Sequence, residues 1–359
     1  MRFRLQPTPA QEAALLEHCA HARYVWNLAV EQHLHWRPGW ASAPGYAEQS
    51  RQLTEARREF AWLAAGSQTM QQQALRDFAQ AMAHFFAGTH RRPTWRKAGV
   101  HEGFRIVGRR GAHWDVRRLT RNVGEVQVPK VGWVRFRWSR DIPDEAKSFR
   151  VNRDRAGRWH VAFAVVPPAI EGPGTGAVVG VDRGVAVSAA LSTGEMSSVP
   201  GPRETEAKRL RRLQRRLARA ARGSNRRKRI KTAIARLKAR QTGRRKDWVE
   251  KTSTDLARRF DLIRVEDLKI KNMVRSARGT IAAPGVNVRA KAGLNRSIHA
   301  AGWGQLASRL EHKAAGRIEK IHPAYTSQTC HACGHCAGKT VRAKRSFAVA
   351  PAGMSITRM

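Results

Sequence analysis

Two apolar segments that end in acidic side chains, 177–182 and 260–268, constrain the fold of this chain most strongly. The first ends at Asp182, and the second carries Glu266 and Asp267 near its end. Short apolar runs bounded by turn residues are typical of strands buried in a sheet. Strand ends bring together carboxylates that are distant in the sequence. We therefore expect Asp182 and Glu266 to face each other at one edge of a sheet.

The residues that follow the first segment predict two more strands, at 185–191 and near 196–199, so that three consecutive strands form a meander. Acids at strand ends in such an arrangement are seen in ribonuclease-H-like nucleases. Two or three of them hold paired Mg²⁺ ions about 3.5–4 Å apart, which activate water and stabilise the leaving oxygen of a phosphodiester. The alternative is that each acid is only a turn or cap residue, because neither is diagnostic alone.

The charge balance indicates a polyanionic partner. The chain has 68 Lys and Arg against 27 Asp and Glu, a formal net charge of +41. Such side chains gain affinity for nucleic acid by releasing phosphate counterions. With 42% apolar residues, the chain is not a disordered basic tail, although a ribosomal or nucleoid-type packing protein has the same balance. We expect no membrane partner and a cytoplasmic location, because no apolar run approaches about 18 residues and no signal peptide is visible. We also expect no small-molecule substrate.

A basic helical hairpin is predicted at 203–245. Helices at roughly 203–221 and 226–240 are joined at Gly-Ser-Asn, and each has only a narrow apolar seam among Arg and Lys. Repulsion between these like charges disfavours the hairpin unless a polyanion lies beside it. A solvated charged face is the alternative. The expected nucleic-acid-binding side chains are those of Arg211, Arg215, Arg216, Arg226, Arg227 and Lys228.

The N-terminal third is predicted to be helical after a short strand at 2–6. A helix is expected to begin at Thr8, because Thr-Pro-Ala-Gln combines an N-cap residue, a proline at the first helical position and a capping-box glutamine. Its apolar residues recur at three- and four-residue steps, which predicts that Cys19 is buried. Further helical patterns fill roughly 46–64 and 68–87.

The middle of the sequence changes to strand-like alternation. At 133–138 and 158–165, arginines alternate with aromatic and aliphatic residues between Gly or Pro boundaries. Such a face can stack on bases or sugars while holding phosphates. A half-solvated sheet with its arginines outside explains the pattern equally well.

Three of the four cysteines form a metal-binding pattern. Cys330 and Cys333 lie in a C-x-x-C-G turn typical of a zinc knuckle, with Cys336 close by. A structural zinc site needs four ligands, normally with a second pair about 12–20 residues further on. No Cys or His follows Cys336, so only His331, His335 or Cys336 could complete the site. We expect weakly bound zinc or none.

Taken together, these motifs resemble the OrfB/TnpB proteins of insertion sequences, a transposase family related to the type V CRISPR effectors. The resemblance covers nearly the whole chain. It is carried by 4–11, 24–27, 180–185, 265–268, 271–273, 301–306 and 326–334.

The resemblance implies a multidomain α/β fold with a RuvC (ribonuclease-H-like) nuclease domain, an N-terminal β-barrel interrupted by a helical recognition lobe, and a partial zinc ribbon. The implied boundaries are 1–8 and 91–170 for the barrel, 9–90 for the lobe, 176–320 for the nuclease domain with its helical insertion at 203–245, and 321–342 for the ribbon.

The same resemblance implies RNA-guided cleavage of DNA, with base pairing reading the target. Guide RNA and DNA are the implied partners, and transposition and DNA recombination at the prokaryotic nucleoid are the implied setting. Asp182 and Glu266 become the first two catalytic carboxylates and the magnesium ligands. Cys330 and Cys333 become the first zinc pair.

The chain departs from the family's pattern at 343–359. Family members continue with a second C-x-x-C-G and an Ala-Asp-x-Asn-Ala-Ala segment that supplies a third carboxylate, and neither occurs here. When the tail is translated back into its allowed codons and these are read two bases later, the shifted frame can encode both missing elements. This compatibility indicates a frameshift near 337–343. We expect a disordered tail and impaired endonuclease activity in a protein that still binds guide RNA and DNA. A non-catalytic RNA- and DNA-binding protein is the alternative.

Overall fold

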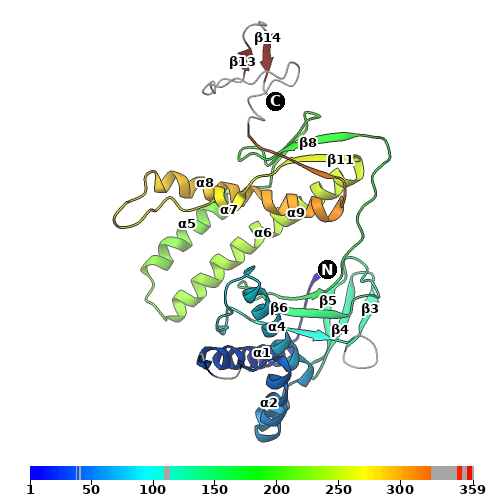
Figure 1. The fold of residues 1–359 in the computed structure, drawn as a ribbon, viewed down its shortest axis with the longest axis vertical. Coiled ribbons are helices and arrows are strands. Elements are labelled where there is room, and N and C mark those ends of the chain that lie inside the picture. The colour runs from blue at the N-terminus through cyan, green and yellow to red at the C-terminus, as the bar shows by residue number, and fades with distance from the viewer. Residues whose placement is uncertain (38, 40–41, 109–113, 325–345, 350–353, 358–359) are drawn as a thin grey trace. The chain divides into compact units, whose positions relative to one another are not determined.

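Figure 1 shows the computed structural model of the chain, an α/β protein with several sheets and helices. It describes residues 1–37, 39, 42–108, 114–324, 346–349 and 354–357. The chain divides into two units, which are considered separately below. The first comprises Met1–Val166 and Leu213–Arg236, and the second comprises Pro167–Arg212 and Leu237–Met359.

The first unit begins with the predicted capping box. Helix α1 (Pro9–His35) starts after Thr8, whose hydroxyl accepts a hydrogen bond from the Gln11 backbone N–H at 3.3 Å. The Gln11 side chain accepts one from the Thr8 N–H at 3.1 Å. Two backbone donors that the helix cannot satisfy by itself are thus paired.

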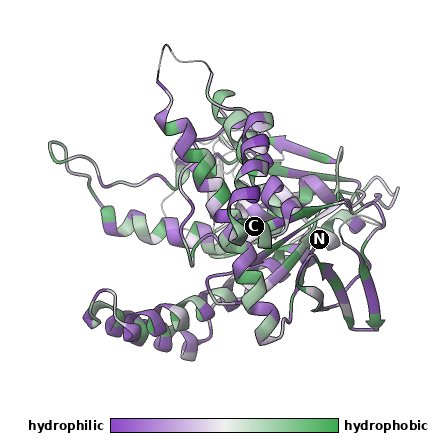
Figure 2. Cartoon of the chain, turned by 90° about the horizontal axis from the view of Figure 1, so that it is seen from below, coloured by the Kyte–Doolittle hydropathy of each residue, from purple (hydrophilic) through white to green (hydrophobic). Residues whose placement is uncertain are grey.

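Three further helices follow in the first unit: α2 (Tyr46–Glu59), α3 (Ala61–Ala65) and α4 (Gln68–Phe86). The pattern at 46–64 predicts one helix, but the extended backbone of Phe60 divides it in two. In Figure 2 the helices are banded purple and green, because hydrophilic and hydrophobic residues alternate along them.

The strands of the first unit form two antiparallel sheets. One has the order β1 (Arg2–Arg4), β7 (Trp159–Phe163), β6 (Ser148–Arg153) and β2 (Gly103–Val107), and the other has the order β3 (Val116–Thr120), β4 (Val123–Val128) and β5 (Gly132–Arg137). A β-bridge between Leu5 and Phe136 and a hydrogen bond from the Gln6 N–H to the Arg135 carbonyl at 2.7 Å link the two sheets. Within the described residues the strands do not close into a ring, so the predicted barrel is not confirmed.

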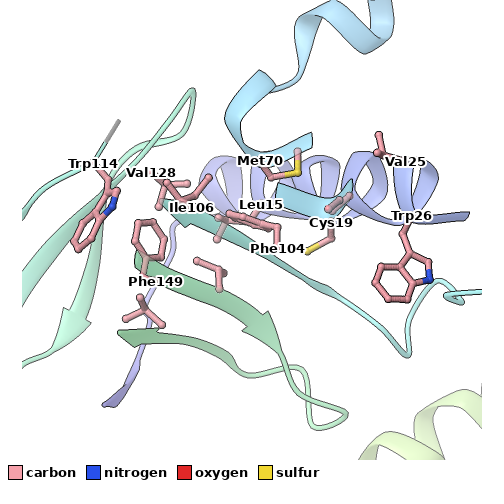
Figure 3. Packing of buried hydrophobic residues seen from close by; sticks show 14 of the residues in the cluster. Leu15, Cys19, Val25, Trp26, Met70, Phe104, Ile106, Trp114, Val128 and Phe149 are labelled. Carbon is pink, nitrogen blue, oxygen red and sulfur yellow. The ribbon is translucent and has the colours of Figure 1, made fainter. Parts of the chain in front are cut away.

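The helices and both sheets of this unit share one hydrophobic core. Figure 3 shows part of it, where Leu15 and Cys19 of α1 lie beside Met70, Phe104 and other side chains of the cluster. Cys19 is fully buried, as predicted, and this burial raises the pKa of its thiol to about 12. The division into a lobe at 9–90 and a barrel stays a prediction.

The second unit contains a mixed five-stranded sheet. Its order is β10 (Met196–Ser197), β9 (Ala189–Leu191), β8 (Val178–Asp182), β11 (Leu262–Glu266) and β12 (Ile318–Ile321). The first three strands along the chain form the predicted antiparallel meander. Strand β11 then pairs in parallel with both β8 and β12. Helices α6 (Asn225–Arg259) and α9 (Trp303–Lys313) contribute side chains to the core of this sheet.

Two helices differ from the sequence expectation. Helix α6 is continuous over 35 residues, because no proline interrupts it and Gly243 is accommodated in its interior. The apolar pattern of the sequence at 294–314 predicts one helix, but Gly302, which has φ 73°, divides this region into α8 (Val288–Ala301) and α9. A left-handed glycine is a usual helix terminator.

The remaining helices are α5 (Glu204–Arg219) and the short α7 (Ile270–Met273). None of the described helices has the length and apolarity needed to cross a membrane. In the tail, where we expect disorder, β13 (Ser346–Val349) pairs antiparallel with β14 (Met354–Thr357). The other residues of 343–359 lie outside the described ones.

We predict that Phe136→Ala destabilises the first unit by about 3–5 kcal/mol, because it leaves a cavity where the ring packs against Phe3, Phe163 and Trp138. The free energy of unfolding in urea measures this effect. Phe86→Ala is the matched control, since Phe86 is 75% exposed and its removal is expected to cost less than about 0.5 kcal/mol. Equal destabilisation by the two substitutions would contradict the assignment of Phe136 to the core.

Candidate active site

The two acids singled out by the sequence lie at the ends of neighbouring parallel strands. The ladder between β8 and β11 pairs Val181 with Val265. The next residues along these strands are Asp182 and Glu266, so both acids lie at the carboxyl end of the sheet. The fold thus brings together two carboxylates that are more than 80 residues apart in the sequence.

Both acids also lie on the same face of the sheet. Successive strand residues point to opposite faces, and Val179, Val181, Ile263 and Val265 are buried in the core. The acids therefore occupy the other face. They line a pocket of about 380 Å³ together with Gly180, Val181, Ala190, Leu191, Ser192, Gly194, Met196, Arg264, Val265 and Ile321.

The carboxylate of Asp182 is exposed and makes no hydrogen bond or ion pair with any residue that the structure describes. The neighbouring Asp267 differs, because its carboxylate accepts a hydrogen bond from Lys269, which is the largest cause of its lowered pKa. Adjacent carboxylates that repel each other favour a bound cation, and carboxylate oxygens are the ligands that Mg²⁺ prefers. In donor chemistry, the two acids are therefore compatible with a divalent metal.

Sequence reasoning missed Arg183, which follows Asp182 and is only 5% exposed. Its guanidinium donates to the backbone carbonyl of Glu266, and at 3.5 Å to that of Trp303 at the start of α9. The Trp303 indole N–H donates in turn to the Gly184 carbonyl at 3.0 Å. These bonds tie the carboxyl ends of β8 and β11 to α9.

Burial lowers the pKa of Arg183, while the nearby charges of Glu266 and Asp182 raise it. The guanidinium thus places a permanent positive charge beside the two acids. A charged residue directly after an apolar strand, inside the motif at 180–185, was the signal that could have revealed it.

The described residues contain no group of three or more His, Cys, Asp or Glu side chains arranged to hold a metal ion. The predicted zinc ligands Cys330 and Cys333 lie outside the described residues. The zinc prediction therefore stays a prediction.

The basic hairpin is formed by α5 and α6, and its contacts show that these helices are antiparallel. Near the turn, the Arg227 guanidinium donates to the carbonyls of Leu217 and Ala220 at 2.8 and 2.9 Å. Away from it, Arg244 forms an ion pair with Glu206. Arg227 therefore caps the end of α5.

The other predicted nucleic-acid-binding side chains of the hairpin are exposed. They form no ion pair within the described part of the chain, which leaves their charges available to phosphates. These residues are Arg211, Arg215, Arg216, Arg226 and Lys228.

Comparison with known proteins identifies the family. The model OrfB_IS605, described as "Probable transposase", matches residues 160–277, and a family helix-turn-helix domain matches 1–37. The "Putative RNA-guided DNA endonuclease InsQ" of Escherichia coli (strain K12) is 32% identical over 354 residues, covering 96% of this chain and 86% of the relative. This chain belongs to the OrfB/TnpB family.

A second family relative, the "Putative RNA-guided DNA endonuclease" of Streptomyces pristinaespiralis, is 33% identical over 349 residues, covering 94% of this chain and 81% of the relative. A "Cas12f1-like, TNB domain" matches residues 303–358 and so extends into the tail that departs from the family's pattern.

Two solved structures align with the OrfB/TnpB chain at low similarity. A CRISPR-Cas12f ternary complex has a TM-score of 0.36 and 14% identity, covering 96% of this chain and 79% of the other. A Cas12f1-sgRNA-target DNA complex has a TM-score of 0.29 and 14% identity, with coverages of 99% and 95%. Family membership rests on the sequence relatives.

We predict that the triple charge reversal Arg211→Glu, Arg215→Glu and Arg216→Glu weakens nucleic-acid binding alike for all sequences. It should also flatten the plot of log affinity against log salt, by about 0.7–0.9 for each phosphate that the hairpin no longer neutralises. Fluorescence anisotropy at several salt concentrations measures both effects. The control is Arg51→Glu, because Arg51 is exposed but already paired with Glu48 and Glu55. An unchanged salt slope in the triple variant would refute the electrostatic role of the hairpin.

Proposed function

We propose that this protein is an RNA-guided DNA endonuclease of the TnpB type, with its cleavage site at Asp182 and Glu266. The observation that carries the proposal is the placement of both acids on one face, at the carboxyl ends of the parallel strands β8 and β11. The order of the five strands, an antiparallel meander followed by two parallel strands, supports a RuvC (ribonuclease-H-like) domain. Further support comes from two relatives whose names describe a putative RNA-guided DNA endonuclease.

In this proposal Asp182 and Glu266 hold catalytic Mg²⁺. When bound, the metal supplies an activated water and neutralises charge at the phosphodiester. Arg183 acts as a positioning residue, because its bonds to the Glu266 and Trp303 carbonyls fix the ends of the two strands. The exposed arginines of the hairpin hold the guide RNA and the DNA through their phosphates.

The encoded chain is proposed to cleave poorly, because 343–359 supplies no third carboxylate. The second candidate function, a non-catalytic protein that binds guide RNA and DNA, rests on the same lack of an acidic residue in 343–359. The partial zinc ribbon at 321–342, with Cys330 and Cys333, and a role in transposition belong to the same proposal.

We predict that Asp182→Asn or Glu266→Gln lowers the affinity for Mn²⁺, used as a spectroscopic substitute for Mg²⁺, by at least about 10- to 100-fold. Removing a metal ligand should weaken metal binding at least as much as removing the groups that orient the ligand. Electron paramagnetic resonance measures the free Mn²⁺ in a titration of the 359-residue chain. The control is Asp267→Asn, since Asp267 is paired with Lys269. If Asp267→Asn weakens binding as much as Asp182→Asn does, the assigned site is wrong.

We predict that restoring the shifted reading frame after 337–343 raises both zinc content and Mg²⁺-dependent DNA cleavage with a cognate guide. The restored sequence would supply a second thiolate pair and an aspartate. Elemental analysis and a cleavage assay measure the two effects. The restored chain carrying Asp182→Asn is the control and should not cleave. If the 359-residue chain cleaves DNA as fast as the restored chain does, the proposal that its cleavage is impaired is wrong.

A further inference from the structure

The extended segment 91–97, here called the strap, lies along α1 in the first unit and is fastened to it on both sides of Trp95. On one side, the Trp26 indole N–H donates to the Thr94 carbonyl at 3.0 Å. On the other, Asn27 makes a reciprocal pair with the Arg96 backbone, donating to its carbonyl at 3.1 Å and accepting from its N–H at 2.7 Å. The backbone of Trp95 is therefore held on each side.

Two further contacts fix the strap. The Arg96 guanidinium lies over the Trp26 ring, 3.6 Å from its centroid, and burial lowers its pKa to about 10, so it stays charged at neutral pH. The Arg92 guanidinium donates to the His33 carbonyl near the end of α1 at 2.8 Å. Holding an extended segment this way costs conformational entropy, so the contacts must compensate for it.

The anchored backbone carries Trp95, whose side chain is exposed to solvent. Trp95 is 50% exposed and has no hydrogen bond or ring contact with any described residue. Trp62 is similarly exposed, at 46%, but packs edge-on against Tyr24 with ring centroids 4.9 Å apart. A large aromatic side chain exposed on a fixed backbone is pre-organised for a partner.

Charge identifies that partner. The sequence has no acidic residue between Asp77 and Glu102, whereas the strap carries four cations. Two of these, Arg91 and Lys97, are exposed and form no ion pair within the described residues. A ring flanked by unpaired cations suits a nucleotide, whose base stacks while its phosphates bind the cations.

The geometry points to Trp95 as a stacking residue for an unpaired base of single-stranded nucleic acid, held by the strap beside phosphate-binding cations. Trp95 belongs to the first unit, whereas the two acids of the proposed cleavage site belong to the second. The stacked base belongs to single-stranded RNA or to single-stranded DNA, because every base offers the same aromatic face.

Binding of labelled oligoadenylate RNA, oligodeoxyadenylate and a DNA duplex of equal length to the full chain tests this. We expect Trp95→Ala to weaken binding to RNA, to single-stranded DNA or to both by roughly 5- to 150-fold, with less effect on the duplex. Its salt slope should stay unchanged, whereas Arg91→Gln with Lys97→Gln should reduce the slope. Which single strand responds shows where the base comes from.

Trp95→Phe should keep most of the affinity because it retains an aromatic face, and Trp62→Ala is the control for removal of an exposed indole. Unchanged binding of Trp95→Ala to both single strands would overturn the proposal, as would an equal weakening on the duplex. Because these assays measure binding without cleavage, their outcome does not depend on the proposed endonuclease activity.

Discussion

The parallel pairing of β8 with β11 is the interaction on which the second unit depends. The core face of these strands is buried with side chains of α6 and α9, which fixes their register. A slip of one residue would turn the whole apolar set of one strand to the opposite face. Either Asp182 or Glu266 would then enter the core, where a carboxylate is costly. The forces that stabilise the sheet therefore also place the acids.

Arg183 makes this arrangement more specific than apolar packing alone. A buried guanidinium is unfavourable unless its donors are paired. Here the two terminal nitrogens bond to backbone carbonyls at the end of β11 and the start of α9, whereas Nε has no hydrogen-bond partner among the described residues. Those partners exist only when the strand ends and the helix are correctly placed. Its charge also lowers the repulsion between the two neighbouring carboxylates.

The sequence predicted the features that depend on local patterns: the capping box at Thr8, the buried Cys19, the meander, and the strands that end in Asp182 and Glu266. It failed where the outcome depends on distant contacts. Gly302 ends a helix whereas Gly243 lies within one, and no local pattern separates the two. The strap is likewise defined by bonds to Trp26 and Asn27, about 70 residues earlier in the chain.

The division into two units bears on the proposed impairment of cleavage. The strap and its anchoring helix α1 belong to the first unit, whereas Asp182, Glu266 and Arg183 belong to the second. The departure from the family's pattern at 343–359 also lies in the second unit. The proposed loss of a carboxylate would weaken metal binding there, but it removes none of the aromatic or basic side chains of the strap. If the proposed loss of cleavage holds, the surfaces proposed for nucleic-acid binding in the first unit are still present in this chain.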